Sequence, residues 1–320
     1  MATAPAATLT ATVDAMSGAA GALLGSLNAA QRAKAQLEFE GDERDYWHYT
    51  PPANHGGITL GELDSAQQRL VHALVVTGTS ITAYSTATQV MAIEPVLGVI
   101  EHQTLHPEAR LFARDPGLYH VSIFGQPGGS GPWGWRFQGH HISLNYTLVD
   151  GEIASLPTFF GSNPAELGAH RPLAAEEDFA RDLVMSLDGD QRSAALISPV
   201  APEDIVTFEH RAVEDGQLPA LFAGGRDLTP EERDEQQAAR RAKLGLTAEM
   251  LEVLKYSSTP RGVAASTMDG GQRQRLTSLI RAYVDRLPNQ VAQFEWTRLE
   301  RGGIDGVHFA WGGPIERHEP

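Results

Sequence analysis

The chain contains no cysteine among its 320 residues. This absence excludes disulfide bonds, thiolate metal sites, iron–sulfur clusters and cysteine nucleophiles. Any metal site would therefore rest on histidine nitrogens and on oxygen ligands, a set that suits zinc, copper or iron. The compartment is not decided by this absence, because a chain without cysteine is tolerated anywhere.

Long hydrophobic runs are also missing. No stretch of 18 apolar residues occurs, so no transmembrane helix is expected. The alanine-rich stretch over residues 6–27 has no basic start and is interrupted by Asp14 and Ser17, unlike a signal peptide. We therefore expect a cytoplasmic protein that does not associate with a membrane.

Positive charge is scarce, since 25 Lys and Arg face 40 Asp and Glu, for a net charge of −15. A polyanion would be repelled unless a local basic patch existed. The basic cluster at residues 240–243 follows an acidic one at 231–235, and this mixture is typical of a solvated helix face. Nucleic acid is therefore not an expected partner, and the sequence does not indicate an oligomeric state.

Two common catalytic motifs are absent as well. The glycine-rich segment 128–131 lacks the Lys-Ser/Thr ending of a phosphate-binding loop and does not open a helix, so no nucleotide cofactor is expected. No serine lies in a Gly-x-Ser-x-Gly elbow, which disfavours a hydrolase of that type.

A helix-start pattern occurs five times. An apolar residue precedes a capping residue, and Gln or Glu follows the cap by three positions, as in a capping box. The spacing between copies is irregular, which argues against a solenoid, and we interpret the copies as five separate helix starts rather than as a repeat with one site per copy. The five boxes are Asn28 with Gln31, Asp64 with Gln67, Asp188 with Gln191, Thr229 with Glu232, and Asp269 with Gln272.

Strand patterns concentrate in the middle of the chain. Residues 118–124 alternate in polarity, 133–149 form a second run, and Asp150-Gly151 predicts a two-residue turn into a third strand over 152–160. A last strand is expected near residues 307–311. Helical patterns, such as the apolar face of 276–287 before Pro288, flank these strands on both sides. This segregation favours an α+β fold.

We predict a single α+β domain over residues 1–320, with a central antiparallel β-sheet flanked by amphipathic helices. The sheet would consist of the hairpin 118–160 and the C-terminal strand, and the proline-rich segment 198–230 would be a linker or a surface excursion. The predicted regions are an N-terminal arm and helices over 1–60, a helical region over 61–105, a β-hairpin core over 115–161, a helical region over 172–302 and a C-terminal strand over 305–312.

The candidate chemistry lies in the hairpin. His140 and His141 are the only adjacent pair among twelve histidines, and strand neighbours point to opposite faces unless a bulge, for which Gly139 is suited, turns one of them. His120 in the neighbouring strand could then share a polar face with His141 and Asn145. Three interpretations stay open: a metal site of His120, His140 and His141; acid–base use of a histidine without metal; or a structural pair, with His140 bonded to a core carbonyl.

Trp133, Trp135 and Arg136 offer a second feature. Two indole rings beside a guanidinium could form a wall for a flat or carboxylate-bearing ligand, with Asn145 and Arg114 nearby. The alternative is that both rings pack in the core, and that Arg114 forms an internal ion pair in the turn before the first strand. The aromatic loop at residues 46–57 is interpreted as an arm on the sheet or as a lid.

Several of these segments together resemble a bacterial family known as domain of unknown function 3500. They are residues 119–120, 124–127, 133–136, 139–145, 157–161 and 309–313. The resemblance brings no established activity, but it implies that Gly139-His140-His141 belongs to a shared pattern. Family members continue past the Phe-Ala-Trp segment with strands that carry further histidines, whereas this chain ends at Pro320. The resemblance therefore implies an incomplete metal site here, if the family draws ligands from that tail, or a shortened form.

The sequence leads us to expect a His-ligated metalloprotein, in which a divalent first-row metal acts on a small organic molecule as Lewis acid, water activator or oxygen-handling centre. The rival expectation is a non-catalytic module that binds a small molecule or a partner protein on the aromatic hairpin. The sequence does not decide whether the protein is an enzyme.

Overall fold

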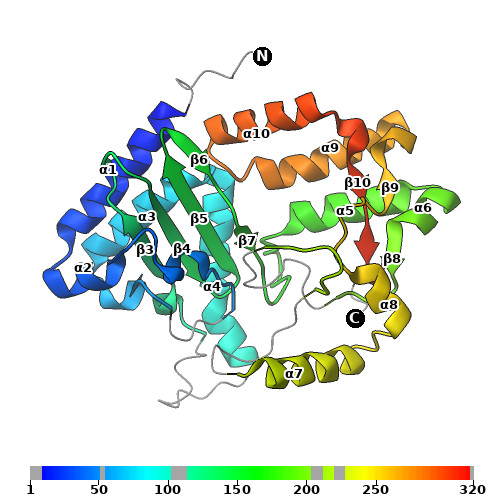
Figure 1. The fold of residues 1–320 in the computed structure, drawn as a ribbon, viewed down its shortest axis with the longest axis horizontal. Coiled ribbons are helices and arrows are strands. Elements are labelled where there is room, and N and C mark those ends of the chain that lie inside the picture. The colour runs from blue at the N-terminus through cyan, green and yellow to red at the C-terminus, as the bar shows by residue number, and fades with distance from the viewer. Residues whose placement is uncertain (1–8, 51–54, 102–113, 203–211, 220–227, 318–320) are drawn as a thin grey trace. The chain divides into compact units, whose positions relative to one another are not determined.

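The structure, a computed structural model, is shown in Figure 1. It divides into two compact units, which are Met1–Ala174 with Tyr283–Thr297 (unit 1) and Ala175–Ala282 with Arg298–Pro320 (unit 2). A single domain over 1–320 stays a prediction, because two compact units of one chain can still fold as one. The residues that the structure describes are 9–50, 55–101, 114–202, 212–219 and 228–317.

Unit 1 is built around a seven-stranded sheet of order β1-β3-β4-β5-β6, with β2 paired to β3 and β7 paired to β5. β1 and β3 are parallel, whereas the other pairs are antiparallel, so the fold is α+β with a mixed sheet. The elements are α1 (Thr10–Ser26), α2 (Ala29–Ala35), β1 (Gln36–Leu37), β2 (Ile58–Thr59), α3 (Ser65–Gly78), α4 (Ile81–Ile100), β3 (His120–Gly125), β4 (Trp133–Gly139), β5 (Ile142–Val149), β6 (Glu152–Ala154) and β7 (Thr158–Phe160), with α10 (Asn289–Gly302) beginning in this unit.

The predicted strand over 133–149 is two strands. β4 ends at Gly139 and β5 begins at Ile142, and these two residues close the hairpin, so that His140 and His141 form its two-residue turn. The next turn was predicted correctly. Asp150 and Gly151 have φ values of 50° and 81°, as a primed hairpin turn between paired Val149 and Glu152 requires.

The two faces of this sheet differ in polarity. One face packs against α1, α3 and α4 as the main hydrophobic core, which includes Trp133, Trp135 and Phe137 (Figure 1). The Trp135 ring packs directly against the backbone of α3 at Gly78, where an added Cβ would lie 2.5 Å from a ring carbon. The opposite face carries the polar rows Ser122–Arg136–Asn145 and His120–Gln138–Ser143, whose members face one another across β3, β4 and β5.

Unit 2 has its own core and its own short strands. β10 pairs antiparallel with β9, and β11 pairs parallel with β8. The prediction that the C-terminal strand joins the central sheet was therefore wrong, because the helical region contains two strands that the sequence reading missed. The elements are α5 (Ala174–Ser186), α6 (Gly189–Ala195), β8 (Leu196–Ser198), α7 (Pro230–Lys243), α8 (Ala248–Leu254), β9 (Val263–Ala264), α9 (Gly270–Val284), β10 (His308–Phe309) and β11 (Trp311–Gly312).

The two units repeat one order of elements: a helix, a short helix, a strand, a second strand, a helix and a closing strand. In unit 1 the closing strand β3 pairs parallel with β1 and antiparallel with β2. In unit 2 the closing segment 308–312 pairs parallel with β8 and antiparallel with β9. The spacing of the capping boxes is irregular because α7 and α8 lie between β8 and β9, whereas the described residues between β1 and β2 form no α-helix.

All five predicted capping boxes form, and four of them make two matching pairs, one pair in each unit. Gln31 and Gln67 donate their side-chain amides to each other, and Gln67 also donates to the carbonyl of Ser26. Gln191 and Gln272 do the same in unit 2, with Ser186 in place of Ser26. We call each reciprocal pair a glutamine interlock. The boxes are closed by reciprocal bonds between cap and third residue at Asn28, Asp64, Asp188, Thr229 and Asp269.

Among the described residues, no helix has the length and the apolar character that crossing a membrane requires.

Candidate functional site

The polar face of the unit 1 sheet is covered by the segment 42–50 and 55–57, which we call the arm. Ser122 Oγ donates to the carbonyl of Gly56 at 2.9 Å, and Gln138 accepts from the backbone N–H of His48 at 3.1 Å. The aromatic loop therefore lies on the sheet, as an arm would, although residues 51–54 lie outside the described part. The polar face of the sheet is consequently covered by another segment of the same chain.

Arg136 anchors the arm. Its guanidinium donates to the carbonyls of Glu43 and Tyr46 at 2.8 Å each, and to Glu43 Oε1 at 2.6 Å. Burial works against the Glu43 carboxylate, but the His55 side chain and Arg136 outweigh it and lower the pKa of Glu43 to about 2. Arg136, at 1% exposure, therefore serves a buried ion pair and does not present its fork to a ligand.

His120 lies in this same polar layer. Its Nε2 is 3.0 Å from Gln138 Nε2, which donates to it, and its Nδ1 faces the carbonyl of Leu118 at 3.4 Å. Burial and the charges on His55 and Arg136 lower the pKa of His120 to about 3, so the ring is neutral. Because both nitrogens face partners within the chain, neither is directed at a point shared with His140 and His141.

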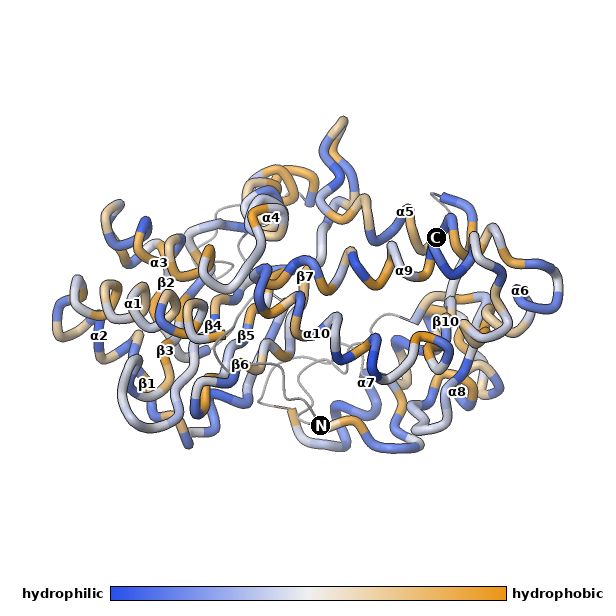
Figure 2. The backbone as a smooth tube through the Cα atoms, turned by 90° about the horizontal axis from the view of Figure 1, so that it is seen from above, coloured by the Kyte–Doolittle hydropathy of each residue, from blue (hydrophilic) through white to orange (hydrophobic). Residues whose placement is uncertain are grey.

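A separate cluster forms at the hairpin end, where His140 meets α4. His140 Nδ1 lies 2.5 Å from Glu94 Oε1, and the two residues are 7% and 3% exposed. The Tyr119 hydroxyl donates to the backbone carbonyl of His140, and this contact fixes the turn against β3. Sequence reasoning missed Glu94, although it is the only charged residue of α4, a helix that Figure 2 shows as largely hydrophobic in its second half.

Burial shifts both members of this pair toward their neutral forms. It raises the pKa of Glu94 to about 7, with Arg114 opposing and Glu101 assisting the shift. Burial and the nearby Arg114 lower the pKa of His140 well below its usual range. The pair therefore carries one titrating proton near neutral pH, and that proton belongs to the pair rather than to either residue alone.

His141 completes the turn in an unusual backbone conformation. Its φ is 63°, a left-handed value that costs an ordinary side chain about 1–2 kcal/mol. Two backbone hydrogen bonds of 2.7 Å hold it there, one to the carbonyl of Tyr49 and one from the N–H of Gly161. Its ring lies against that of His140, with centroids 3.8 Å apart, and it is more exposed than His140. Strain of this kind persists where neighbours enforce it, often at functional sites.

Arg114 lies near this cluster but does not form the predicted ion pair within its turn. Its Nε and Nη2 bind the carboxylate of Glu101 at 2.8 and 3.1 Å, while Asp115 instead caps the N–H of Gly117. The Nη1 of Arg114 is buried and has no hydrogen-bond partner within the described residues. Arg114 thus adds a fixed positive charge beside Glu94 and His140.

The other predicted site residues lie elsewhere. Trp133 and Trp135 are buried in the core, with the Trp135 ring stacked on Tyr146, so they form no ligand wall. Asn145 donates to Ser143 and to the carbonyl of Pro157. Within the described residues, no group of three or more His, Asp or Glu side chains is arranged to hold a metal ion. Of the three predicted metal ligands, His140 and His141 thus lie against each other, whereas the ring of His120 stacks on that of His55 in the polar layer, with centroids 5.7 Å apart.

Comparison with known proteins agrees with the resemblance seen in the motifs. The chain matches a family described as "Protein of unknown function (DUF3500)" over residues 10–320. Searches of curated proteins and of solved structures gave no match. Because the family match covers nearly the whole chain, both units with their capping boxes and the hairpin with its histidine turn, this protein is a member of the DUF3500 family.

Proposed function

We propose that this protein is an enzyme that transfers a proton to or from a small organic molecule, with the Glu94–His140 pair as its acid–base group. The observation that supports this proposal most is the 2.5 Å contact between Glu94 Oε1 and His140 Nδ1, both of which are buried at the end of the hairpin. A general acid or base works best when its pKa lies near the working pH, and burial gives Glu94 a pKa of about 7.

The proton balance of the pair is simple. In the protonated form Glu94 donates its proton to Nδ1 of the neutral His140 ring, and Nε2 carries the one ring N–H. When the pair loses the Nε2 proton, the Glu94 proton moves to Nδ1, which then donates to the carboxylate, and Nε2 is left with a free electron pair that can take a proton from a substrate. Such a carboxylate holds the imidazole in one tautomer and orientation. Nε2 makes no hydrogen bond to a described residue.

The metal-dependent form of this proposal fits the geometry less well. It needs His120, His140 and His141 around one point, whereas His120 is bonded into the polar layer under the arm. Proton transfer needs only the pair at the hairpin end. The non-catalytic alternative depended on an aromatic surface, and Trp133 and Trp135 are 3% and 1% exposed.

The test is chemical labelling of histidine with diethyl pyrocarbonate, which acylates uncharged imidazole nitrogen, followed by peptide mass spectrometry. The His140 labelling rate should rise with pH around a midpoint near 7, matching the pKa of Glu94. The Glu94→Gln variant should lose this midpoint, while labelling of half-exposed His308 stays the same. A midpoint retained in Glu94→Gln would refute the assignment of the pair.

Activity can be sought without knowing the substrate. A panel of small ketones, 2-oxo acids and esters in D₂O reports proton transfer to carbon as deuterium incorporation, measured by NMR. Incorporation by the native chain should fall at least ~100-fold in His140→Gln, because general acid–base groups contribute about 10²–10⁴ in rate. The His308→Gln variant is the matched control.

A further inference from the structure

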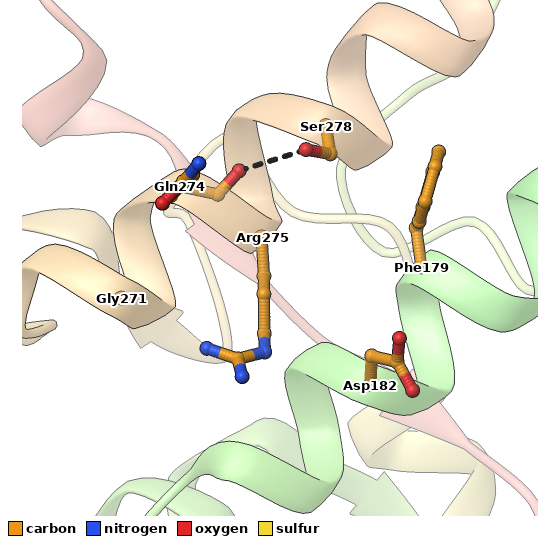
Figure 3. A pocket seen from close by; sticks show the side chains of 6 residues that line it. All are labelled: Phe179, Asp182, Gly271, Gln274, Arg275 and Ser278. Carbon is orange, nitrogen blue, oxygen red and sulfur yellow. Dashed lines mark hydrogen bonds between the residues drawn. The ribbon is translucent and has the colours of Figure 1, made fainter.

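A cavity of about 290 Å³ lies within unit 2, between α5 and α9 (Figure 3). This volume is near the lower limit of small-molecule pockets, so it suits a compact ligand rather than a nucleotide. It is distant in sequence from the hairpin and takes no part in the proposed proton transfer. Its lining residues are Phe179, Asp182, Gly271, Gln274, Arg275 and Ser278.

The two walls carry opposite charges. Asp182 projects from α5 and Arg275 from α9, and Figure 3 shows no bond between the carboxylate and the guanidinium. Within the described residues, neither side chain has a hydrogen bond or an ion pair. Phe179 adds an apolar surface, since its ring lines the same cavity with 37% of the residue exposed. An acid, a base and an aromatic ring thus border one space.

The equivalent place in unit 1 has none of these groups. Counting from the matching caps Asn28 and Asp188, Phe179 and Asp182 correspond to Ala19 and Ala22 of α1. Counting from Asp64 and Asp269 in the same way, Arg275 corresponds to Leu70 of α3.

The helix packing differs accordingly. In unit 1, α1 packs along α3, and Ala19 and Leu70 lie against the core. In unit 2, α5 and α9 share the core through Leu183 and Leu276, but their backbones run less closely together than those of α1 and α3. At the positions compared, these helices thus carry small and apolar side chains in unit 1, and in unit 2 an aromatic ring and two charged side chains that border a cavity.

We propose that this cavity binds a free α-amino acid with an apolar side chain, in its zwitterionic form. The carboxylate would accept the planar fork of Arg275, whose geometry suits carboxylates. The ammonium would donate to Asp182, and the apolar side chain would pack on the ring of Phe179. A ligand with only one of the two charges would leave the opposite wall without a partner.

Isothermal titration calorimetry on the full chain tests this with three probes of one shape. L-leucine carries both charges, 4-methylpentanoate lacks the ammonium group, and 3-methylbutylamine lacks the carboxylate. L-leucine should bind at least ~10-fold more tightly than either analogue, since a charge-assisted hydrogen bond contributes about 1.5–3 kcal/mol, or roughly 10-fold to 100-fold. No heat of binding at millimolar L-leucine, or equal affinity for the three probes, overturns the proposal.

The variants Arg275→Gln and Asp182→Asn should each weaken L-leucine binding at least ~10-fold. Both side chains are exposed, so the fold should tolerate these changes. The exposed Arg301 of α10 provides the matched control, and Arg301→Gln should leave the affinity unchanged. The doubly changed variant Asp182→Arg/Arg275→Asp keeps one charge of each sign, and it should recover part of the affinity with the ligand reversed. Unchanged binding in both single variants also contradicts the site.

Discussion

The two units share a local framework and differ in what surrounds it. His120 and His308 stand at matching places at the start of the closing strand, and each points Nδ1 at the carbonyl two residues earlier, at 3.4 and 3.1 Å. His120 is buried, since β4 pairs beside it and the arm covers its face of the sheet. His308 is half-exposed, because among the described strands β10 and β11 pair only with β8 and β9. The shared framework comes from local sequence, and the candidate chemistry comes from the β4–β5 hairpin of unit 1, which has no counterpart among the described residues of unit 2.

The largest expected difference concerns the arginines of the two units. Arg136→Met in unit 1 should lower the free energy of unfolding by about 3 kcal/mol, because it leaves the Glu43 carboxylate without its buried partner. Arg273→Met in unit 2 removes a more exposed bridge to Asp305 and should cost under ~1 kcal/mol. Urea unfolding of both variants measures the contrast, and equal losses would break the comparison.

The same ion pair predicts a pH dependence confined to unit 1. The pKa of Glu43 is about 2 in the folded chain and 4.5 without its partners, so its contribution is complete above pH 4.5 and is lost as the pH falls toward 2. Thermal unfolding between pH 5 and 2 should show this loss in the native chain, and Glu43→Gln should remove that part of the pH dependence.

A smaller and symmetric effect is expected at the glutamine interlocks. Gln67→Ala and Gln272→Ala each remove one half of a reciprocal amide pair and the side-chain oxygen that accepts from the N–H of the capping residue. Each should lower the free energy of unfolding by about 1–2 kcal/mol, and the two values should agree, because the bonds lost are the same. Losses that differ by more than ~1 kcal/mol would show that the units use the interlock differently.

The smallest effect is expected at the histidine turn. His141→Gly relieves a positive φ, but glycine also gains freedom in the unfolded chain, so stability should rise by less than ~1 kcal/mol. The control is Asp150→Gly at the other hairpin turn, where φ is 50°. A loss of stability in His141→Gly alone would show that contacts of the imidazole outweigh the backbone strain.

The sequence predicted those features that depend on neighbours along the chain. The five capping boxes, the turn at Asp150-Gly151 and the shared polar face of His120 and Asn145 are found in the structure, whereas His141, predicted on that face, lies in the hairpin turn. Each follows from a spacing of a few residues or from the alternation of a strand, and both are visible in a single chain.

The features that depend on distant partners were missed. Glu94 lies 46 residues before His140, and the Glu43 partner of Arg136 lies 93 residues before it. The short strands β8 and β9 exist only because the segment 308–312 pairs with them. A signal for Glu94 was nevertheless present, since a single carboxylate in an apolar helix needs a buried partner.

The glutamine interlocks also bear on how the newly made chain sorts its helices. The amide of Gln31 that pairs with Gln67 has the same donors and acceptors as Gln191, which pairs with Gln272. A wrong partnership between halves from different units would therefore satisfy these amides as fully as the right one. Discrimination must come from the apolar side chains around each interlock, and erroneous exchange between similar modules is a known failure of chains built from repeats.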